Sequence, residues 1–364
     1  MTTPTLASVR HLPIAAGVPG ALVRSWLVFV AALVVAMIVV GGLTRLTDSG
    51  LSITEWQPIM GAIPPLSEAD WQAAFAKYQA IPQFTSVNSD MTLAGFKTIY
   101  WWEWAHRFLG RFIGAALALP FAVFWLGGRL STQLSWRVLA VGCLVGIQGA
   151  LGWYMVKSGL AGRIDVSPYR LALHLSVAFL ILGALVWLIC ETAPHASGER
   201  AAPVGRRRWA YGLAVLMFAQ VALGGLVAGL KAGRAFNTWP LMDGRFIPDG
   251  IGRLEPWWLN ATENMATVQF DHRIMAYLIV VLVLWQAVRV WRPVETGARV
   301  RTTALALAAG VVAQAALGIA TVVNGVPLGL GIAHQTLAAL VFIAAVAHVH
   351  AMSRAGRCGS ETSN

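Results

Sequence analysis

The chain has 364 residues, of which 57% are hydrophobic and only 12% carry a charge. Soluble domains carry about 25% charged residues, so the composition excludes an ordinary soluble protein. The formal net charge of +11 would suggest nucleic acid as the partner of a soluble chain. Here, however, the arginines stand at the ends of apolar runs, and we expect no nucleic-acid partner.

Eight apolar runs succeed one another along the chain, and each has the length of about 20 residues that crosses the hydrocarbon of a bilayer as a helix. They lie at 25–43, 104–126, 136–156, 170–190, 208–230, 264–286, 302–323 and 331–351. The first run follows a polar tail and is too long for the core of a cleaved signal peptide. The sequence therefore predicts an all-α polytopic protein with eight transmembrane helices in a lipid bilayer.

Arginine clusters in segments on one side of the predicted membrane. The short connections 127–137, 192–208 and 291–301 are rich in arginine, and both tails also carry it. By the positive-inside rule these segments face the cytoplasm. We therefore expect both termini in the cytoplasm and the long connections, 46–99 and 231–263, on the outer side.

Cysteine is placed poorly for structural chemistry. Cys143 and Cys190 fall inside or at the end of predicted spans, and Cys358 belongs to the C-terminal tail. None lies in an outer connection, where disulfides form. We therefore expect no structural disulfide and no thiolate metal site.

The second apolar run opens with a stretch dense in polar and aromatic side chains, Tyr100–Arg111. It holds a carboxylate (Glu103), an imidazole (His106) and two guanidinium groups. Such groups are costly in a bilayer and are rarely kept there without a partner or a function. Glu103 and His106 stand three residues apart, so a helix places both on one face.

Landmarks of the first half recur in the same order in the second half. Gly41-Gly42-Leu43 matches Gly224-Gly225-Leu226, His106-Arg107 matches His272-Arg273, Gln148–Gly152 matches Gln314–Gly318, and His174 matches His334. Each unit has an even number of spans, so both copies have the same orientation. We predict two four-helix bundles, 1–198 and 199–364, related by a pseudo-twofold axis along the membrane normal. Glycines that cluster in these spans, such as Gly152 and Gly224, are interpreted as close helix packing.

Four of the eight histidines share one depth in the predicted membrane. They are His106, His174, His272 and His334. Each stands in the first few turns of a helix that enters from the outer side, so all four lie in the outer half. The others are interpreted as solvated or interfacial residues of the tails, a loop or the last turn of the final helix. They are His11, His195, His348 and His350.

Two histidines on two helices of each bundle favour a metal or haem site over interhelical hydrogen bonding alone. A tetrahedral zinc site needs further His, Cys or acidic ligands, and the sequence does not offer such ligands in both bundles. Two opposed imidazoles are what a planar iron porphyrin binds on its two faces, and the gap between facing helices is a suitable slot. Arg107, Arg273 and Arg111 could pair with propionates, or alternatively extend toward lipid headgroups.

The two copies differ three residues before the first histidine, where Glu103 precedes His106 and Gln269 precedes His272. A carboxylate can take up a proton and stabilise a cation, and an amide can do neither. The first half is therefore the candidate for chemistry, and the second half is the candidate for a held cofactor.

Three classes of function are open to a duplicated membrane protein with these histidines. A quinol-linked di-haem b-type cytochrome would carry electrons without modifying haem, but a transmembrane electron path needs histidines at both ends of the helices. A secondary transporter is expected to show broken helices and polar groups at the midplane. An enzyme that acts on a haem or quinone near the outer surface fits better. Its acid is Glu103, with Glu55 and Asp48 in the first outer connection as alternatives.

The motifs as a set resemble one known family. Gly41–Ser52, Trp56-Gln57-Pro58, Gly61–Pro65, the Glu103–Arg107 motif and the paired histidines resemble the haem A synthase family, in its bacterial and mitochondrial branch, over nearly all of residues 25–350. The resemblance implies an eight-helix oxidoreductase of the bacterial inner membrane. Such an enzyme oxidises the C8 methyl of haem O to a formyl group and so makes haem A for cytochrome oxidase.

The resemblance also implies roles for single residues. His106 and His174 would hold the substrate haem O, with Glu103 as the catalytic residue beside the reacting methyl. His272 and His334 would ligate a haem b that serves as redox cofactor. Some members carry cysteine pairs in their outer loops, and this chain has none there. The family's haem O synthase, a farnesyltransferase, is a candidate partner.

Overall fold

The computed structural model describes residues 20–57, 60–160, 162, 164–194, 202–291 and 297–354. His11, His195 and Cys358 lie outside the described residues, as does the predicted boundary between the units 1–198 and 199–364.

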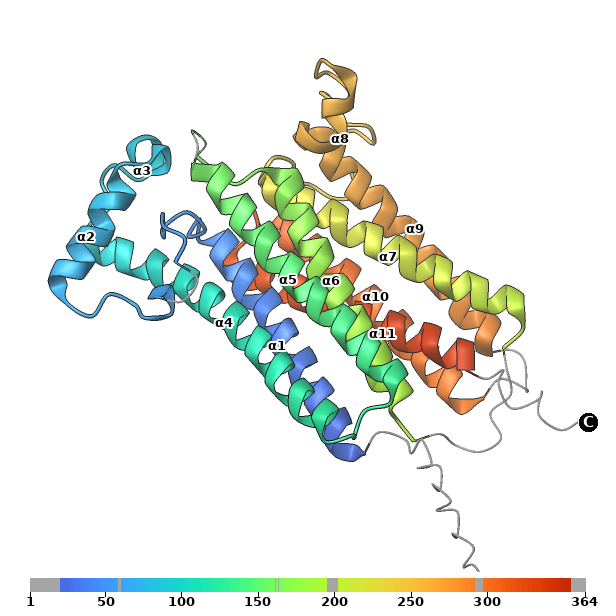
Figure 1. The fold of residues 1–364 in the computed structure, drawn as a ribbon. Coiled ribbons are helices and arrows are strands. Elements are labelled where there is room, and N and C mark those ends of the chain that lie inside the picture. The colour runs from blue at the N-terminus through green and yellow to red at the C-terminus, as the bar shows by residue number, and fades with distance from the viewer. Residues whose placement is uncertain are drawn as a thin grey trace, which may run out of the picture.

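Eight long helices form the body of the molecule (Figure 1). They are α1 (Ala21–Leu46), α4 (Leu93–Leu126), α5 (Thr132–Leu160), α6 (Pro168–Glu191), α7 (Val204–Gly229), α9 (Met265–Trp291), α10 (Ala298–Val323) and α11 (Leu328–Arg354). Each is long and apolar enough to cross a membrane, and the described residues contain no β-strand. The prediction of an all-α protein with eight membrane-spanning helices is confirmed.

The helices associate as two groups of four whose neighbour relations correspond. In the first group α1 packs on α4 and α6, and α5 packs on α4 and α6. In the second group α7 packs on α9 and α11, and α10 packs on α9 and α11. Between the groups, α1 contacts α11, α7 contacts α6, and α6 contacts α11. These relations fit the predicted pseudo-twofold arrangement, which exchanges α1 with α7 and α6 with α11.

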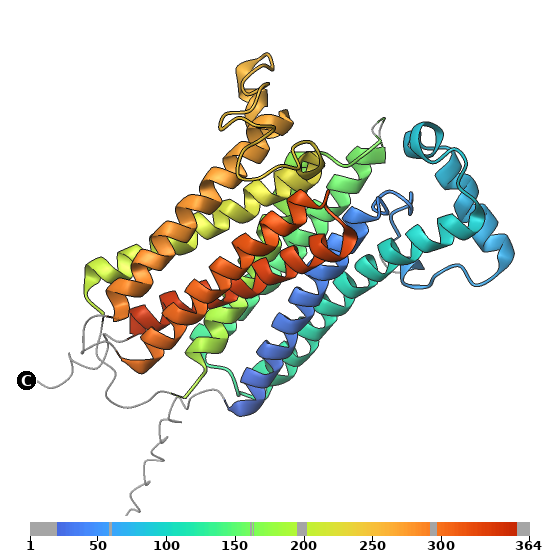
Figure 2. The ribbon, with the colours of Figure 1, turned by 180° about the vertical axis from the view of Figure 1, so that it is seen from behind.

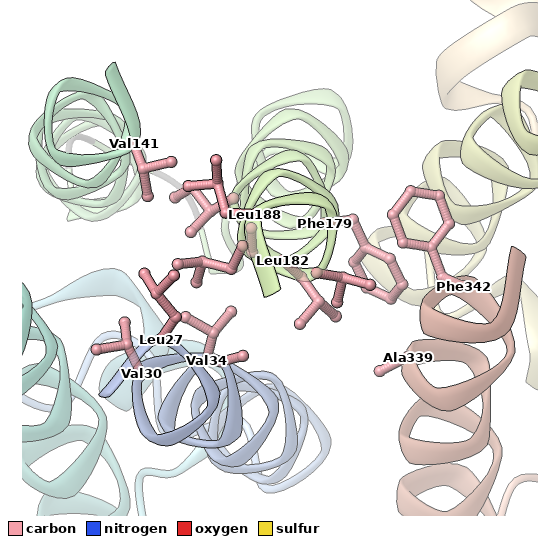
Figure 3. Packing of buried hydrophobic residues seen from close by; sticks show 14 of the residues in the cluster. Leu27, Val30, Val34, Val141, Phe179, Leu182, Leu188, Ala339 and Phe342 are labelled. Atoms are coloured by element: carbon pink, nitrogen blue, oxygen red, sulfur yellow. The ribbon is translucent and has the colours of Figure 1, made fainter. Parts of the chain in front are cut away.

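The largest apolar cluster lies where the two groups meet. Figure 3 shows Leu27 and Val30 of α1 beside Leu182 of α6, and Phe179 of α6 against Phe342 of α11. The two phenyl rings meet edge to face with centroids 5.4 Å apart. Because lipid tails are as apolar as these side chains, close packing rather than water exclusion holds such an interface together.

Both long connections lie at one end of the bundle, here called the loop end, opposite the end at which α11 finishes (Figures 1 and 2). The first connection holds η1 (Met60–Ala62), α2 (Glu68–Gln79) and α3 (Pro82–Val87), and the second holds η2 (Ala232–Arg234), η3 (Trp257–Leu259) and α8 (Asn260–Glu263). Helix α4 begins 11 residues before its apolar run, because Thr92 caps it and Phe96 and Tyr100 pack on Trp71 of α2.

Helix α2 starts at a capping box. The Ser67 hydroxyl accepts from the Asp70 backbone N–H at 3.1 Å, and the Ser67 N–H donates to the Asp70 carboxylate at 3.0 Å. The Ser67 hydroxyl also donates to that carboxylate, and these hydrogen bonds hold the pKa of Asp70 below its ordinary value. The chain leaves the loop and enters the helix at a defined residue as a result.

The interpretation of His348 and His350 as solvated or interfacial residues is wrong. They are only 1% and 3% exposed, because α11 continues to Arg354 and its last turns stay enclosed by neighbouring helices. Nδ1 of His348 lies 3.0 Å from the Thr303 hydroxyl of α10. The His350 ring packs edge to face on Trp187 of α6 at 5.1 Å. Both histidines belong to the core at the end opposite the loop end.

Candidate functional site

The first predicted histidine pair comes together between α4 and α6. The ring centroids of His106 and His174 are 6.4 Å apart, and the ring planes are inclined by 56°. Imidazole–metal bonds are about 2.0 Å long, so this separation leaves room for one metal atom between two ring nitrogens. The structure thus brings together two residues that are 68 positions apart in the sequence.

The second pair shares one cavity. His272 of α9 and His334 of α11 both line a cavity of about 340 Å³ whose wall comes mainly from the second helix group and, on one side, from α1 and α6. Apolar side chains such as Met217, Val280 and Phe342 form most of the remaining wall. Cofactor sites have volumes of roughly 300–1,000 Å³ and mainly apolar walls with a few polar groups, and this cavity has both properties.

Each of the four imidazoles rests on a glycine of a neighbouring helix, and we call these four residues the seat glycines. They are Gly41 of α1 under His106, Gly152 of α5 under His174, Gly224 of α7 under His272, and Gly318 of α10 under His334. A Cβ atom at these positions would lie 3.0, 3.0, 3.3 and 2.8 Å from the imidazole Cε1. A Cβ atom at Gly318 would force the imidazole to move, and at the other three positions the ring would have to give by a few tenths of an ångström, so glycine is what permits the observed ring positions without a shift.

This finding corrects part of the glycine interpretation. Gly152 and Gly224 serve the histidines, whereas Gly225 and Gly229 do pack closely on another helix, against the Cα atoms of Ala172 and Pro168. Glycine in a helix costs roughly 0.5–1 kcal/mol relative to alanine. At the seat glycines that cost is offset by access of the imidazole to the helix backbone.

Three of the four histidines are also braced by a glutamine one turn before the seat glycine. Gln148, Gln220 and Gln314 each donate from Nε2 to the backbone carbonyl of His174, His272 and His334 respectively, at 3.0 Å in every case. The same Nε2 atoms lie 3.2–3.4 Å from ring nitrogens of these histidines. His106 differs, because Met37 stands at the position four before Gly41.

The spacing Gln-x-x-x-Gly is therefore the sequence signal for a histidine seat. Within the long helices it occurs at Gln148–Gly152, Gln220–Gly224 and Gln314–Gly318, whereas the same spacing at Gln57–Gly61, in the first connection, has no histidine against its glycine. The first and third of these are landmarks of the sequence repeat, but their contact with the histidines becomes apparent only in the structure. Residues four apart lie on one helix face, so the amide and the glycine meet the same partner.

The polar atoms of the two histidine pairs can be compared with the ligands that an iron porphyrin needs. The Nδ1 atoms of His106, His174 and His272 are buried and make no hydrogen bond to any residue that the structure describes. Within the same part of the chain, no three His, Cys, Asp or Glu side chains gather as a ligand set. A metal at either pair would need its remaining ligands from elsewhere, and a porphyrin supplies four nitrogens in a plane. The residues fit such a group.

Glu103 lies one turn from His106 on α4 and is 2% exposed. Its Oε2 accepts from the Ser52 hydroxyl at 2.7 Å and from the Ile53 backbone N–H at 2.8 Å. Its Oε1 accepts from Arg107 at 2.6 Å. A buried carboxylate is stable only with such partners. The arrangement ties the start of the first outer connection to α4 directly beside the histidine.

Arg107 completes this contact by donating to two loop carbonyls. Its terminal nitrogens reach the carbonyl of Ile53 at 2.7 Å and that of Glu55 at 2.9 Å. In the second half, Arg273 donates in the corresponding way to the carbonyls of Phe236 and Thr238, both at 2.8 Å. The pairing of Arg107 and Arg273 with propionates stays a prediction, and in this structure both side chains position the loops over the histidines.

The chemical difference between the halves is preserved in the structure. Gln269, which matches Glu103, is also 2% exposed, but it donates to the carbonyl of Phe236 at 3.1 Å. Ala235 stands where the first half has Ser52, so the hydroxyl donor is lost together with the carboxylate. The first half thus keeps a buried negative charge with its donors, and the second half keeps neither.

A network of charged residues crosses the two halves at the loop end, on the rim of the cavity. Lys231 lies 3.0 Å from Asp48 and 3.1 Å from Asp165, and Arg45 lies 2.8 Å from Asp48. Asp48 and Lys231 occupy matching positions after α1 and α7, and both are in the left-handed region, with φ of 52° and 53°. Arg45, Asp48, Lys231 and the exposed Arg234 also line the cavity.

Other predicted candidates lie outside this arrangement. Glu55 pairs with Lys77 at 2.7 Å and stays about half exposed, so it is a surface group of the first connection. Arg111 donates to the carbonyl of Gln57 at 3.0 Å. The residues that the structure concentrates around the histidines are the seat glycines, the glutamines and the Glu103–Arg107 contact.

Comparison with known proteins places the chain among related sequences. The model of the family described as cytochrome oxidase assembly protein matches residues 24–346. A protein of Azorhizobium caulinodans named "Heme A synthase" is 52% identical over 344 residues, which cover 94% of this chain and 97% of that protein. A protein of the same name from Chelativorans sp. is 50% identical over 328 residues, with 90% of each chain covered. One from Brucella anthropi is 47% identical over 327 residues, covering 90% and 91%.

Proposed function

The chain belongs to the cytochrome oxidase assembly protein family that its matches define, and from this premise we propose that it is a membrane oxidoreductase that converts haem O to haem A. The observation that carries the proposal is the pair of seated imidazoles in each half, found in a chain about half identical to proteins named heme A synthase. An enzyme with two haem positions needs such a duplicated ligand set.

In this proposal His106 and His174 hold the substrate, and oxidation of its C8 methyl to a formyl group takes place in the first half. His272 and His334 would hold haem b, which when bound would supply a redox-active iron able to accept electrons. The cavity of about 340 Å³ around the second pair supports this division, because its apolar wall suits a porphyrin. Arg45, Lys231 and Arg234 on its rim are cations suited to propionates.

Glu103 is the residue that we assign to the chemistry. Its carboxylate is buried one turn from His106, so it can accept a proton or offset positive charge at the methyl carbon as electrons leave. To take a proton it must release one of its present donors, and the Ser52 hydroxyl is the donor that can rotate away. Gln269 cannot take this role, which supports confinement of the reaction to the first half.

Membrane placement follows from the same premise. The eight apolar helices make the chain a multi-pass membrane protein. We propose that it lies in the bacterial inner membrane with both termini in the cytoplasm, so that the loop end and all four site histidines face the outer side. A haem O synthase is then a fitting neighbour, because it makes the substrate that this enzyme consumes.

The test is a pyridine haemochrome spectrum, with chromatography of extracted haem, on the detergent-purified protein. We expect haem B together with haem O, haem A or a hydroxylated intermediate. Haem B alone at two per chain would contradict the proposal and favour a di-haem b-type cytochrome. Protein without any haem would also contradict it and leave the histidines as interhelical contacts.

A further inference from the structure

Each Gly-Gly pair of the repeat allows two other helices to approach closely, one at each glycine. In α1, Gly41 is the seat of His106, and the next residue, Gly42, faces across to α11 of the other half. In α7, Gly224 is the seat of His272, and Gly225 faces across to α6 of the first half. The two histidine pairs are therefore connected through adjacent residues of α1 and of α7.

The contact across α1 and α11 is polar. The amide Nε2 of Gln335, the residue that follows His334, donates to the backbone carbonyl of Ile38 at 2.6 Å. A Cβ atom on Gly42 would lie 2.6 Å from the Gln335 amide oxygen. Side chains in a helix cover the turn before them, so any side chain at position 42 would block the carbonyl of residue 38. Glycine at 42 is what lets Gln335 reach α1.

The matching contact across α7 and α6 is apolar. Leu175, the residue that follows His174, stands at the position of Gln335, and its side chain lies 3.5 Å from where a Cβ of Gly225 would be. The Cα atom of Ala172 lies 2.8 Å from the same Cβ position, so the backbone of α6 also packs directly against Gly225. A leucine donates no hydrogen bond, so Leu175 meets Gly225 through van der Waals contact.

We propose that Gln335 is the residue that couples the two histidine pairs and sets the route for electron exchange between them. The proposal rests on the proposed function. In the haem-loaded protein, one electron would pass from an iron held by His106 and His174, oxidised from Fe(II) to Fe(III), to an iron held by His272 and His334, reduced from Fe(III) to Fe(II). No further reactant is needed for this exchange.

The route crosses two non-covalent contacts, one between the His106 ring and Gly41 and one between the Ile38 carbonyl and Gln335. It runs from His106 to its seat Gly41, along α1 to the carbonyl of Ile38, through the hydrogen bond to Gln335, and along one peptide unit to His334. Each route includes a van der Waals contact between a histidine ring and its seat glycine, and the two differ where they cross the interface: the first crosses by a hydrogen bond, the second by the contact of Leu175 with Gly225. We therefore expect the route through Gln335 to couple the pairs more strongly. Gln335 also fixes the position of α1, and hence of the seat glycine, relative to α11.

The experiment compares four forms of the full-length protein loaded with both haems in lipid nanodiscs. They are the wild type, Gln335→Leu, Gln335→Leu combined with Leu175→Gln, and Thr336→Val. Gln335→Leu places at the α1–α11 contact the residue type that Leu175 provides at the α7–α6 contact. The double variant moves the amide to the mirrored contact, where the carbonyl of Val221 corresponds to that of Ile38. Thr336→Val is the matched control, because the Thr336 hydroxyl donates within its own helix, to the backbone carbonyl of Ile332 at 2.8 Å.

Two readouts are taken on each form. Haem content and the low-spin spectrum report whether both pairs still bind, and relaxation after pulsed photoreduction reports the rate of exchange between the haems. We expect Gln335→Leu to keep both haems and to slow exchange several-fold, the double variant to regain most of the rate, and the control to match the wild type.

Three outcomes would overturn the inference. Exchange that stays within experimental error of the wild type in Gln335→Leu, with both haems bound, removes the role in coupling. Loss of haem from both pairs in that variant shows Gln335 to be a packing residue instead. Wild-type protein that binds no haem overturns the proposed function itself, and the inference falls with it.

Discussion

Replacement of a seat glycine by alanine is the most direct perturbation of the histidine pairs. At Gly318 the added Cβ would lie 2.8 Å from Cε1 of His334, while ordinary contacts of this kind begin at 3.4 Å. The ring must therefore retreat by about 0.6 Å, and metal–ligand distances tolerate deviations of about 0.2 Å. We expect Gly318→Ala to lose haem from the second pair and Gly152→Ala, with 3.0 Å to His174, to lose it from the first.

The assay is haem per chain by pyridine haemochrome, with chromatography to tell the two haems apart. Gly146→Ala on α5 is the matched control, because nothing lies within 4 Å of its added Cβ. That control should keep both haems and gain roughly 0.5–1 kcal/mol of helix stability. Wild-type haem content and an unchanged spectrum in Gly318→Ala would refute the assignment of these glycines as seats.

Three further substitutions test other parts of the site. Glu103→Gln should keep both haems but lower formyl production by about 100-fold, since the amide takes no proton; extracted-haem chromatography checks this, and wild-type haem A yield would contradict the assignment. Lys231→Glu repels Asp48 and removes a rim cation, so we expect about 1 kcal/mol weaker, or roughly fivefold lower, haem b affinity by titration; unchanged affinity would exclude Lys231 as a propionate partner. Ser67→Ala removes the hydroxyl that lowers the pKa of Asp70, so this pKa should rise. A carboxyl whose pKa is lowered by folding stabilises the folded state at pH values above its ordinary pKa, and that stabilisation is lost as the pH falls through the lowered pKa. With a higher pKa for Asp70, the variant should lose it sooner as the pH falls, so α2 should become protease-sensitive at a higher pH than in the wild type.

The fold could be predicted from the sequence because a bilayer permits few solutions. Runs of apolar residues must be helices there, since an unpaired backbone is too costly, and arginine clusters mark their ends. The start of α4 at Leu93 was not predictable in this way, because that extension depends on packing of Phe96 and Tyr100 against Trp71. A hydropathy pattern shows which residues can lie in lipid, but it does not show that a helix is extended beyond the lipid by packing against a neighbouring loop.

The site residues that could be predicted are those whose polar side chains are energetically costly in a membrane. The small residues of the site were harder to predict. His106, His174, His272 and His334 stand out because imidazoles are rare in membrane spans. The seat glycines do not stand out, because glycine is common at membrane helix contacts for reasons of packing. His348 and His350 were misplaced because a histidine near a helix end looks interfacial, and only tertiary contacts show that α11 remains enclosed there.

The ion pair between Asp48 and Lys231 has a consequence for the ancestry of the chain. These residues hold equivalent places in the two copies, and across the interface each meets the other. An assembly of two first copies would set one aspartate against another, and an assembly of two second copies would set lysine against lysine. Each copy is thus electrostatically matched to its sister and mismatched to itself. The two halves, expressed as separate polypeptides, should find each other rather than form self-paired dimers, and the fused gene has lost the option of reverting to a single repeating subunit.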